Sequence, residues 1–355
     1  MLRHASNRSW RLLPAAAFAF AMAGFTADAG AQTKTITDSA GRKIAVPAEV
    51  KHVYAAGNPA TILIYTLAPE KLIGWTRKMA ARAEPFMPKQ YFDLPEVGRL
   101  TDRGNTANIE VVLGTKPDLI FDYGTINQAF TEIADRMQDQ TKIPYMLVDG
   151  SFDKIPEAYR LLGQALGAPE RAEKLAAYAE KVVAEVKATQ AKVPVDKRPK
   201  VYYGRGPNGL DTGLQGSINV ELLEKVGARN VAEAAGKGGL NTVSIEQVLT
   251  WNPDIILTIE RDFFGRMPND PRWSAIKAIK DKRFYLAPEF PFPWFDMPPS
   301  VNRLMGVRWL TYLLYPDQQN VDLAASAREF YELFYHIKLT DAQVNELLAT
   351  AARKS

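Results

Sequence analysis

The chain has 355 residues, of which 46% are hydrophobic, and this is enough apolar material for two buried cores. Its formal charge is only +4 and its basic residues form no cluster, so neither a nucleic-acid partner nor an anionic membrane is indicated. The absence of cysteine excludes disulfides, thiolate metal sites, a cysteine nucleophile and a lipid-modified N-terminal cysteine.

The N-terminus has the pattern of a secretion signal. Three arginines precede an apolar run from Leu12 to Phe25, and an A-x-A cleavage pattern, Ala29-Gly30-Ala31, follows. The run falls short of the roughly 20 residues that a membrane-spanning helix needs. We therefore predict a signal peptide over residues 1–31, cleaved after about Ala31, and a periplasmic mature protein without a lipid anchor.

Residues 35–166 have the pattern of an α/β lobe. A first core strand runs into the turn Gly57-Asn58-Pro59 and then a helix, which would place backbone N–H groups at the carboxyl edge of a sheet, although a plain turn explains the same residues. The predicted elements are a hairpin over Thr35–Val46, strands Lys51–Ala56, Leu72–Trp75, Asp118–Tyr123 and Ile143–Asp149, and helices Ala60–Leu67 and Ile155–Leu166.

Residues 167–194 are predicted to form a bridge made of one long helix, Pro169–Lys192. Proline suits the first helical position, and Val193-Pro194 ends the pattern. One side of the helix carries apolar residues at spacings of three, four and seven: Ala172, Leu175, Ala176, Ala179, Val182, Val183 and Val186. This stripe predicts a stiff helix packed along one side.

A repeat flanks this helix. The segment EVVLGTKPDLIF, Glu110–Phe121, recurs 136 positions later as EQVLTWNPDIIL, Glu246–Leu257. Each copy has the pattern of a helix, a Pro-Asp turn and a buried strand. The predicted fold class is therefore α/β, with two similar α/β lobes bridged by one long backbone helix.

The second lobe is predicted over residues 198–316, with C-terminal helices in residues 317–355. Its segment Gly204–Gly209 matches G-x-G-x-x-G, but Pro207 and a further Gly-rich stretch stand where a dinucleotide-binding helix would begin. The predicted elements are strands Lys200–Tyr203 and Phe284–Pro288 and helices Asn219–Val226, Val301–Leu314, Ala324–Phe334 and Asp341–Ala352.

The sequence gives little support for an enzyme. Outside the signal segment its histidines are His52 and His336, and neither has a second histidine nearby, so both are interpreted as structural or solvated. No spacing singles out a pair of carboxylates, although a secreted hydrolase stays open as an alternative, as does a structural interaction protein. We predict no catalytic residue, no metal ligand and no cofactor.

A ligand site is indicated instead. The loop Pro288–Ser300 is rich in prolines and aromatic residues, and it either packs Trp294 against the next helix or forms an aromatic wall of a pocket. Arg103, Arg205 and Arg261 are expected beyond the carboxyl end of a predicted strand or beside the cleft, and a guanidinium suits anionic oxygens. The predicted ligand contacts are Arg103, Tyr123, Tyr203, Arg205 and Trp294.

Several segments carry a family resemblance. They are TDSAGRKIAVPAEVKHVYAAGNPA, residues 97–118 ending in KPD, RLLGQALGAPERAEKL, VSIEQVLTWNPDII and FPWFDMPPSVNRLMGVRWL. Together they resemble the periplasmic binding proteins that feed iron-siderophore, haem and cobalamin importers of the ATP-binding-cassette (ABC) type. The resemblance implies two lobes joined by one helix, a shallow ligand cleft, little lobe closure, and an inner-membrane permease dimer as partner.

The ligand expected from the resemblance is a metal chelate. A bare transition metal would need histidine, cysteine or clustered carboxylates as ligands. We therefore expect the protein to bind the metal as a complex with a chelator. An anionic ferric siderophore fits the arginines and aromatic residues best. The alternatives are an oxyanion such as molybdate or tungstate, haem bound through a tyrosine, cobalamin, and chelated nickel.

Glu110 and Glu246 are the predicted docking points for the permease. Each stands two residues after a probable N-cap, Asn108 or Ser244, and so in the first turn of its helix. An acid there also interacts favourably with the helix dipole and needs no partner. In the family that the chain resembles, a glutamate at this place in each lobe pairs with permease arginines. We expect the protein to act as a monomer.

Overall fold

The computed structural model describes residues 32–101, 108–316 and 321–351. The predicted signal peptide and Arg103 lie outside these ranges. Inside them, no helix combines the length and the apolar character that crossing a membrane requires.

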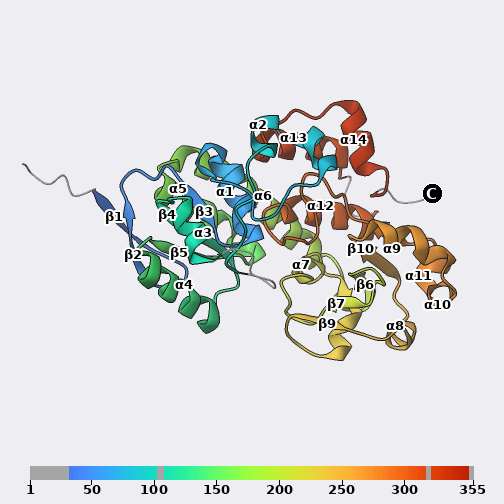
Figure 1. The fold of residues 1–355 in the computed structure, drawn as a ribbon. Helices are drawn as coiled ribbons and strands as arrows, with labels where there is room; N and C mark the ends of the chain where they lie inside the picture. The colour runs from blue at the N-terminus through green and yellow to red at the C-terminus, as the bar shows by residue number, and fades with distance from the viewer. Residues whose placement is uncertain (1–31, 102–107, 317–320, 352–355) are drawn as a thin grey trace, which may run out of the picture. The chain divides into compact units, whose positions relative to one another are not determined.

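A parallel sheet forms the centre of the N-terminal lobe (Figure 1). Its strands run in the order β3-β4-β5 and are buried along almost their whole length, as expected where helices cover both faces of a sheet. An antiparallel hairpin, β1–β2, precedes it and confirms the alternating pattern of the sequence. The strands are β1 (Thr33–Thr37), β2 (Lys43–Pro47), β3 (Val53–Ala55), β4 (Leu119–Gly124) and β5 (Tyr145–Asp149). The helices are α1 (Asn58–Leu67), α2 (Lys89–Phe92), α3 (Ile109–Gly114), α4 (Gln128–Thr141) and α5 (Ile155–Leu166).

The C-terminal lobe has a second parallel sheet, in the order β11-β10-β6-β8, and a small antiparallel pair, β7–β9. The strands are β6 (Lys200–Gly204), β7 (Asp211–Gly213), β8 (Arg229–Asn230), β9 (Leu240–Thr242), β10 (Ile255–Thr258) and β11 (Phe284–Leu286). The helices are α7 (Glu221–Lys225), α8 (Ile245–Trp251), α9 (Arg261–Arg266), α10 (Pro271–Ser274), α11 (Lys277–Lys280), α12 (Arg303–Leu314), α13 (Leu323–Phe334) and α14 (Asp341–Leu348).

The sequence repeat is also a structural repeat. The first copy forms α3 and β4, and the second forms α8 and β10. Both Pro-Asp turns hold the neighbouring strand in the same way: Asp118 Oδ2 accepts hydrogen bonds from the Lys51 and His52 N–H groups at 2.7 and 2.8 Å, and Asp254 Oδ2 accepts one from the Lys200 N–H at 3.0 Å. The two lobes are therefore built on one plan, which confirms the predicted fold class.

The predicted long helix is α6 (Pro169–Ala191), and every residue of its apolar stripe is buried. It packs on α5 and α1 of the first lobe and on α12 and α7 of the second. Polar contacts add to this packing, since Arg171 Nη2 donates to the Thr66 and Leu333 carbonyls, and Arg308 Nη1 donates to the Tyr178 hydroxyl at 2.6 Å. The helix thus holds both lobes along one side.

An ion pair between the buried Arg303 and the partly buried Glu221, which we call the seam, also joins the lobes. Arg303, at the start of α12, is fully buried; its Nη1 donates to Glu221 Oε2 at 2.8 Å and its Nη2 to the Gly150 carbonyl at 2.5 Å. Glu221 also accepts a hydrogen bond from the Phe152 N–H at 3.1 Å. Because Gly150 and Phe152 follow β5 while Glu221 and Arg303 belong to the second lobe, the seam fixes the lobes against each other.

Two segments depart from the predicted arrangement. Leu72–Trp75 forms no strand, because it makes only isolated bridges, Val53↔Leu72 and Trp75↔Glu96. The segment around α2 packs against the C-terminal helices rather than only on its own lobe: Arg82 lies 3.6 Å from Glu346, and Gln343 donates to the Pro85 carbonyl (Figure 1). A capping box of Thr340 and Gln343 starts α14.

Candidate functional site

A cavity of about 520 Å³, here called the cleft, lies between the two lobes. The first lobe contributes the start of α1, the segment around Arg99, and the carboxyl end of β4. The second lobe contributes Arg205, just after β6, and residues Asp296–Pro299 of the proline-rich loop. The site therefore lies where parallel α/β sheets usually bind ligands, beyond the carboxyl ends of their strands.

Arg205 is held in the cleft wall by a buried carboxylate. Its Nε lies 2.9 Å from Asp296 Oδ2, which also accepts a hydrogen bond from the Tyr203 hydroxyl at 3.0 Å. Asn219 Nδ2 donates to the other carboxylate oxygen at 2.8 Å. Burial alone would lower the pKa of Arg205, but the attraction of Asp296 raises the pKa above its ordinary value. The guanidinium is therefore charged and fixed in orientation.

Arg77 and Arg99 bring two more guanidinium groups to the same cavity. Arg77 is exposed, and its Nη2 reaches the Met297 carbonyl of the second lobe at 3.3 Å. Asp122, the second aspartate of the lining, is engaged within its own lobe, because it accepts hydrogen bonds from the Tyr145 hydroxyl at 3.2 Å and the Tyr123 N–H at 3.0 Å. With three arginines and two aspartates, the lining carries a net positive charge.

Tyr123 lies at the carboxyl end of β4, and its ring lines the cleft. Its side chain is almost wholly buried, and its hydroxyl lies close to the charged groups of the seam, Arg303 and Glu221. Burial raises the pKa of this tyrosine, so the hydroxyl keeps its proton.

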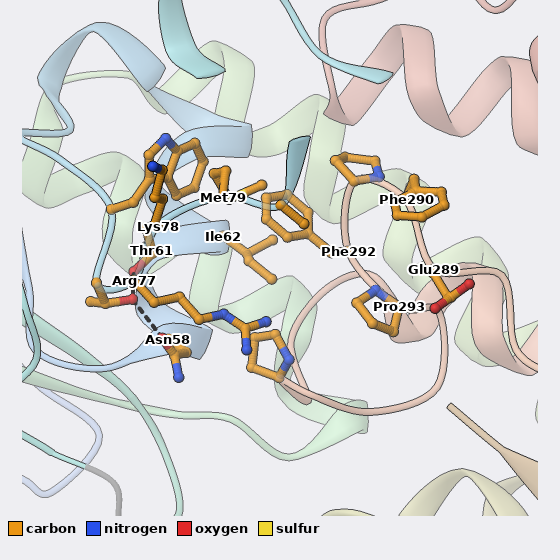
Figure 2. A pocket seen from close by; sticks show the side chains of 15 residues that line it. Asn58, Thr61, Ile62, Arg77, Lys78, Met79, Glu289, Phe290, Phe292 and Pro293 are labelled. Carbon is orange, nitrogen blue, oxygen red and sulfur yellow. Dashed lines mark hydrogen bonds between the residues drawn. The ribbon is translucent and has the colours of Figure 1, made fainter. Parts of the chain in front are cut away.

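A second cavity of about 300 Å³, here called the side pocket, adjoins the cleft (Figure 2). Figure 2 shows aromatic and aliphatic side chains around it, among them Phe290, Phe292, Ile62 and Met79. Asn58, Arg77 and Pro298 line both cavities, so the two spaces are neighbours. The site as a whole combines a cationic compartment with an apolar one.

The proline-rich loop serves both of its predicted roles. Its first part supplies Phe290 and Phe292 to the side pocket, and its last part supplies Asp296 and Met297 to the cleft. Between them the backbone passes so close to α12 that a Cβ on Gly306 would overlap the Trp294 carbonyl.

Two of the predicted ligand contacts lie in the core instead of the cleft. Trp294 is fully buried, and its indole N–H donates to the Tyr331 hydroxyl at 3.2 Å, so the packing interpretation is correct for this residue. Tyr203 is also fully buried, and its hydroxyl donates to Asp296 at 3.0 Å. Among the other arginines, Arg103 lies outside the described residues, and Arg261 pairs with Glu289 and does not line the cleft.

Arg77, Arg99 and Asp296 were missed by the sequence analysis. Arg77 and Arg99 follow the segments ending at Trp75 and Gly98, so the rule that selected Arg205, an arginine just after a strand-like segment, would have found both. Asp296 gave no such signal, because its role depends on the folding of a loop with no periodic pattern. Within the described ranges, no three histidine or acidic side chains lie close enough to hold a metal ion together.

The two glutamates predicted to meet a permease are exposed at equivalent places. Asn108 caps α3 by accepting from the Val111 N–H at 3.0 Å, and Ser244 caps α8 in a full capping box. Glu110 and Glu246 follow in the first turns, and both side chains are exposed. Hydrogen bonds from its own backbone N–H and from Ser244 lower the pKa of Glu246, so it stays charged well into the acidic range.

Comparison with known proteins gives consistent results. Residues 72–290, more than half of the chain, match the family model described as periplasmic binding protein. The molybdate-binding protein MolA of Haemophilus influenzae is 29% identical over 338 residues, covering 85% of this chain and 91% of that protein.

Solved structures show the same fold. An ABC transporter solute binding protein from Sulfurospirillum deleyianum aligns with a TM-score of 0.80 at 29% identity, covering 89% of this chain and 99% of that one. MolA bound to molybdate aligns with a TM-score of 0.73 at 24% identity, covering 86% and 99%. Such proteins bind a transported ligand rather than a resident cofactor. The chain therefore belongs to the periplasmic binding protein family, the solute-binding components of ABC importers.

Proposed function

We propose that this protein captures an anionic metal chelate, of which a ferric siderophore is the leading example, and delivers it to an inner-membrane ABC permease. The observation that carries this proposal is the placement of Arg77, Arg99 and Arg205, from both lobes, around one cavity. Guanidinium groups bind the anionic oxygens of a chelate through charge-assisted hydrogen bonds.

The size and chemistry of the site favour an organic chelate over a small ion. The cleft of about 520 Å³ lies within the range of roughly 300–1,000 Å³ that small organic ligands occupy. The side pocket adds an apolar compartment with Phe290, Phe292 and Met79 in its wall. An arm of a chelating molecule could bury apolar surface there, whereas a bare oxyanion has no group that would gain from it.

A molybdate-type oxyanion is the second candidate. It is favoured by the 29% identity to a molybdate-binding protein over most of the chain. Such an ion would use the arginines and leave the side pocket empty. The two candidates therefore share the cleft and differ in their use of the side pocket.

Calorimetric titrations with two probes separate the candidates. A synthetic ferric bis-catecholate and sodium molybdate are titrated into the parent protein, Arg77→Gln and Met79→Glu. For a chelate receptor, both substitutions weaken ferric bis-catecholate binding, because Arg77 borders both cavities and Met79 lines only the side pocket. Tight molybdate binding that Met79→Glu leaves unchanged, with no binding of the chelate, would establish the oxyanion instead. Binding that neither substitution alters would place the ligand elsewhere.

We further propose that the chain is exported by its N-terminal segment, acts as a monomer in the periplasm, and meets the permease dimer through Glu110 and Glu246. The support is their equivalent, exposed placement at the first turns of α3 and α8, one in each lobe. A dimeric permease offers two equivalent surfaces, which a repeat with one acid per lobe can meet together.

A further inference from the structure

Exposed apolar side chains concentrate on the same two helices. Among the described residues, four large hydrophobic side chains are at least 36% exposed: Val111, Leu113, Val195 and Leu249. Three of these four lie on α3 or α8. Leu113 and Leu249, exposed by 44% and 36%, are equivalent positions of the repeat.

Each leucine lies on the same face of its helix as the proposed docking acid. Glu110 and Leu113 are three residues apart, as are Glu246 and Leu249, and side chains at this spacing are neighbours on a helix surface. The equivalent valines Val112 and Val248 are buried and anchor the opposite face to each lobe. Each helix thus packs with one side and presents an acid beside a leucine on the other.

The rest of the exposed surface differs between the two copies. Val111 corresponds to Gln247, Gly114 to Thr250, and Lys116 to Asn252. Among the exposed helix positions, the acid and the leucine are identical in both copies. An isolated exposed leucine needs no explanation, but the same acid–leucine pair at equivalent points of two otherwise different surfaces indicates a shared partner.

We propose that Leu113 and Leu249 form the apolar half of the permease-docking surface, each entering an apolar hollow of one permease subunit beside a basic side chain that meets the neighbouring glutamate. This inference rests on the proposed delivery function. The glutamates and the leucines are expected to have different roles. Exposed charges steer association and raise the on-rate, while desolvated apolar side chains slow dissociation.

The test uses the full-length mature protein and its cognate permease complex reconstituted in nanodiscs. Leu113→Gln combined with Leu249→Gln keeps helix-forming side chains of similar length and removes the apolar surface. We expect the dissociation constant to rise about tenfold for each leucine and about a hundredfold for the pair, through a faster off-rate and with an unchanged salt dependence. Val195→Gln is the matched control, since Val195 is 76% exposed and belongs to neither helix, and it should bind as the parent does.

Three results would overturn the inference in distinguishable ways. If the double leucine variant binds like the parent while Glu110→Gln with Glu246→Gln binds weakly, docking is electrostatic alone and the leucines play no part. If the parent forms a dimer in sedimentation experiments and the leucine variant is monomeric, the surface covers a second copy of this chain. If the folded parent does not bind the permease at all, the delivery function itself fails, and the leucine proposal fails with it.

Discussion

The seam and the cleft each contain an arginine paired with a carboxylate, but the two arginines have different surroundings. In the seam, Arg303 is fully buried and all its named partners, Glu221 and the Gly150 and Ser300 carbonyls, belong to the protein. In the cleft, Arg205 is fixed by Asp296 but stays partly exposed in the wall of a large cavity. An arginine whose hydrogen bonds are satisfied internally stabilises a fold, whereas one held in position at an open cavity is prepared for a ligand.

The comparison predicts that the seam matters most for stability. Arg303→Ala would remove a fully buried arginine and leave the partly buried Glu221 with only Lys225, at 3.7 Å, as a cation partner, and we expect the free energy of unfolding to fall by about 3 kcal/mol. Urea unfolding followed by circular dichroism measures this. The control is Arg160→Ala, because Arg160 pairs with Glu173 and Glu180 at the surface, where such pairs contribute about 1 kcal/mol or less. Equal losses for both variants would remove the distinction between seam and surface.

In the cleft the loss should appear in ligand binding as well as in stability, because Arg205→Ala also leaves the buried Asp296 without its charge partner. Arg205→Ala is expected to weaken binding of ferric bis-catecholate by about 1.5–3 kcal/mol, because one charged hydrogen-bonding group is lost. Calorimetric titration of the folded variant measures it. Arg160→Ala should bind as the parent does, since this arginine pairs with Glu173 and Glu180 at the surface and lines neither the cleft nor the side pocket. A comparable loss in both variants would indicate that net charge, rather than placement in the cleft, determines affinity.

Glu110 and Glu246, the proposed docking residues, lie in neither the seam nor the cleft, and their substitution should affect transport alone. Glu110→Lys combined with Glu246→Lys reverses two exposed charges, so melting temperature and ligand affinity should stay nearly unchanged. We expect the permease affinity to fall at least tenfold, about 1.4 kcal/mol, and uptake by cells to collapse. Uptake at the parental rate by a folded, exported variant would leave the helix dipole as the sole explanation for these acids.

The smallest expected effect concerns pH. Burial lowers the pKa of His336 below its ordinary value, and nearby Arg171 lowers it further, so the folded state holds the ring neutral. The unfolded chain binds a proton more readily, and stability should therefore decrease as the pH falls through about 6.5. His336→Asn should reduce this slope in urea titrations between pH 7.5 and 5, and asparagine tolerates the local φ of 59°. An unchanged slope would mean that other groups cause it.

Periodic patterns predicted most of the fold. The stripe of Pro169–Lys192 and the repeated Pro-Asp segments were enough to predict α6 and the two lobes, because burial of an apolar face leaves a regular trace in the sequence. The prediction of a strand at Leu72–Trp75 was wrong, because the hydrophobic pattern of only four residues is too short to identify a strand.

The site was predicted less completely. Tyr123 and Arg205 line the cleft, and the rule of arginines after strands would also have found Arg77 and Arg99. Trp294 could not be assigned from sequence, because a proline-rich loop gives no indication of which aromatic rings face inward. The seam shows the same limit, since Gly150 and Arg303 are far apart in the chain and neither has a sequence signal.

The most direct test of the account is native mass spectrometry, with metal analysis, of the protein isolated from its own periplasm. The account predicts one bound ligand per chain, with a mass that contains a metal and an organic chelator, and a lower occupancy in Arg77→Gln prepared in parallel. A bound mass equal to molybdate or another bare oxyanion, or equal occupancy in parent and variant, would contradict the proposal that the cleft and the side pocket together hold an anionic metal chelate.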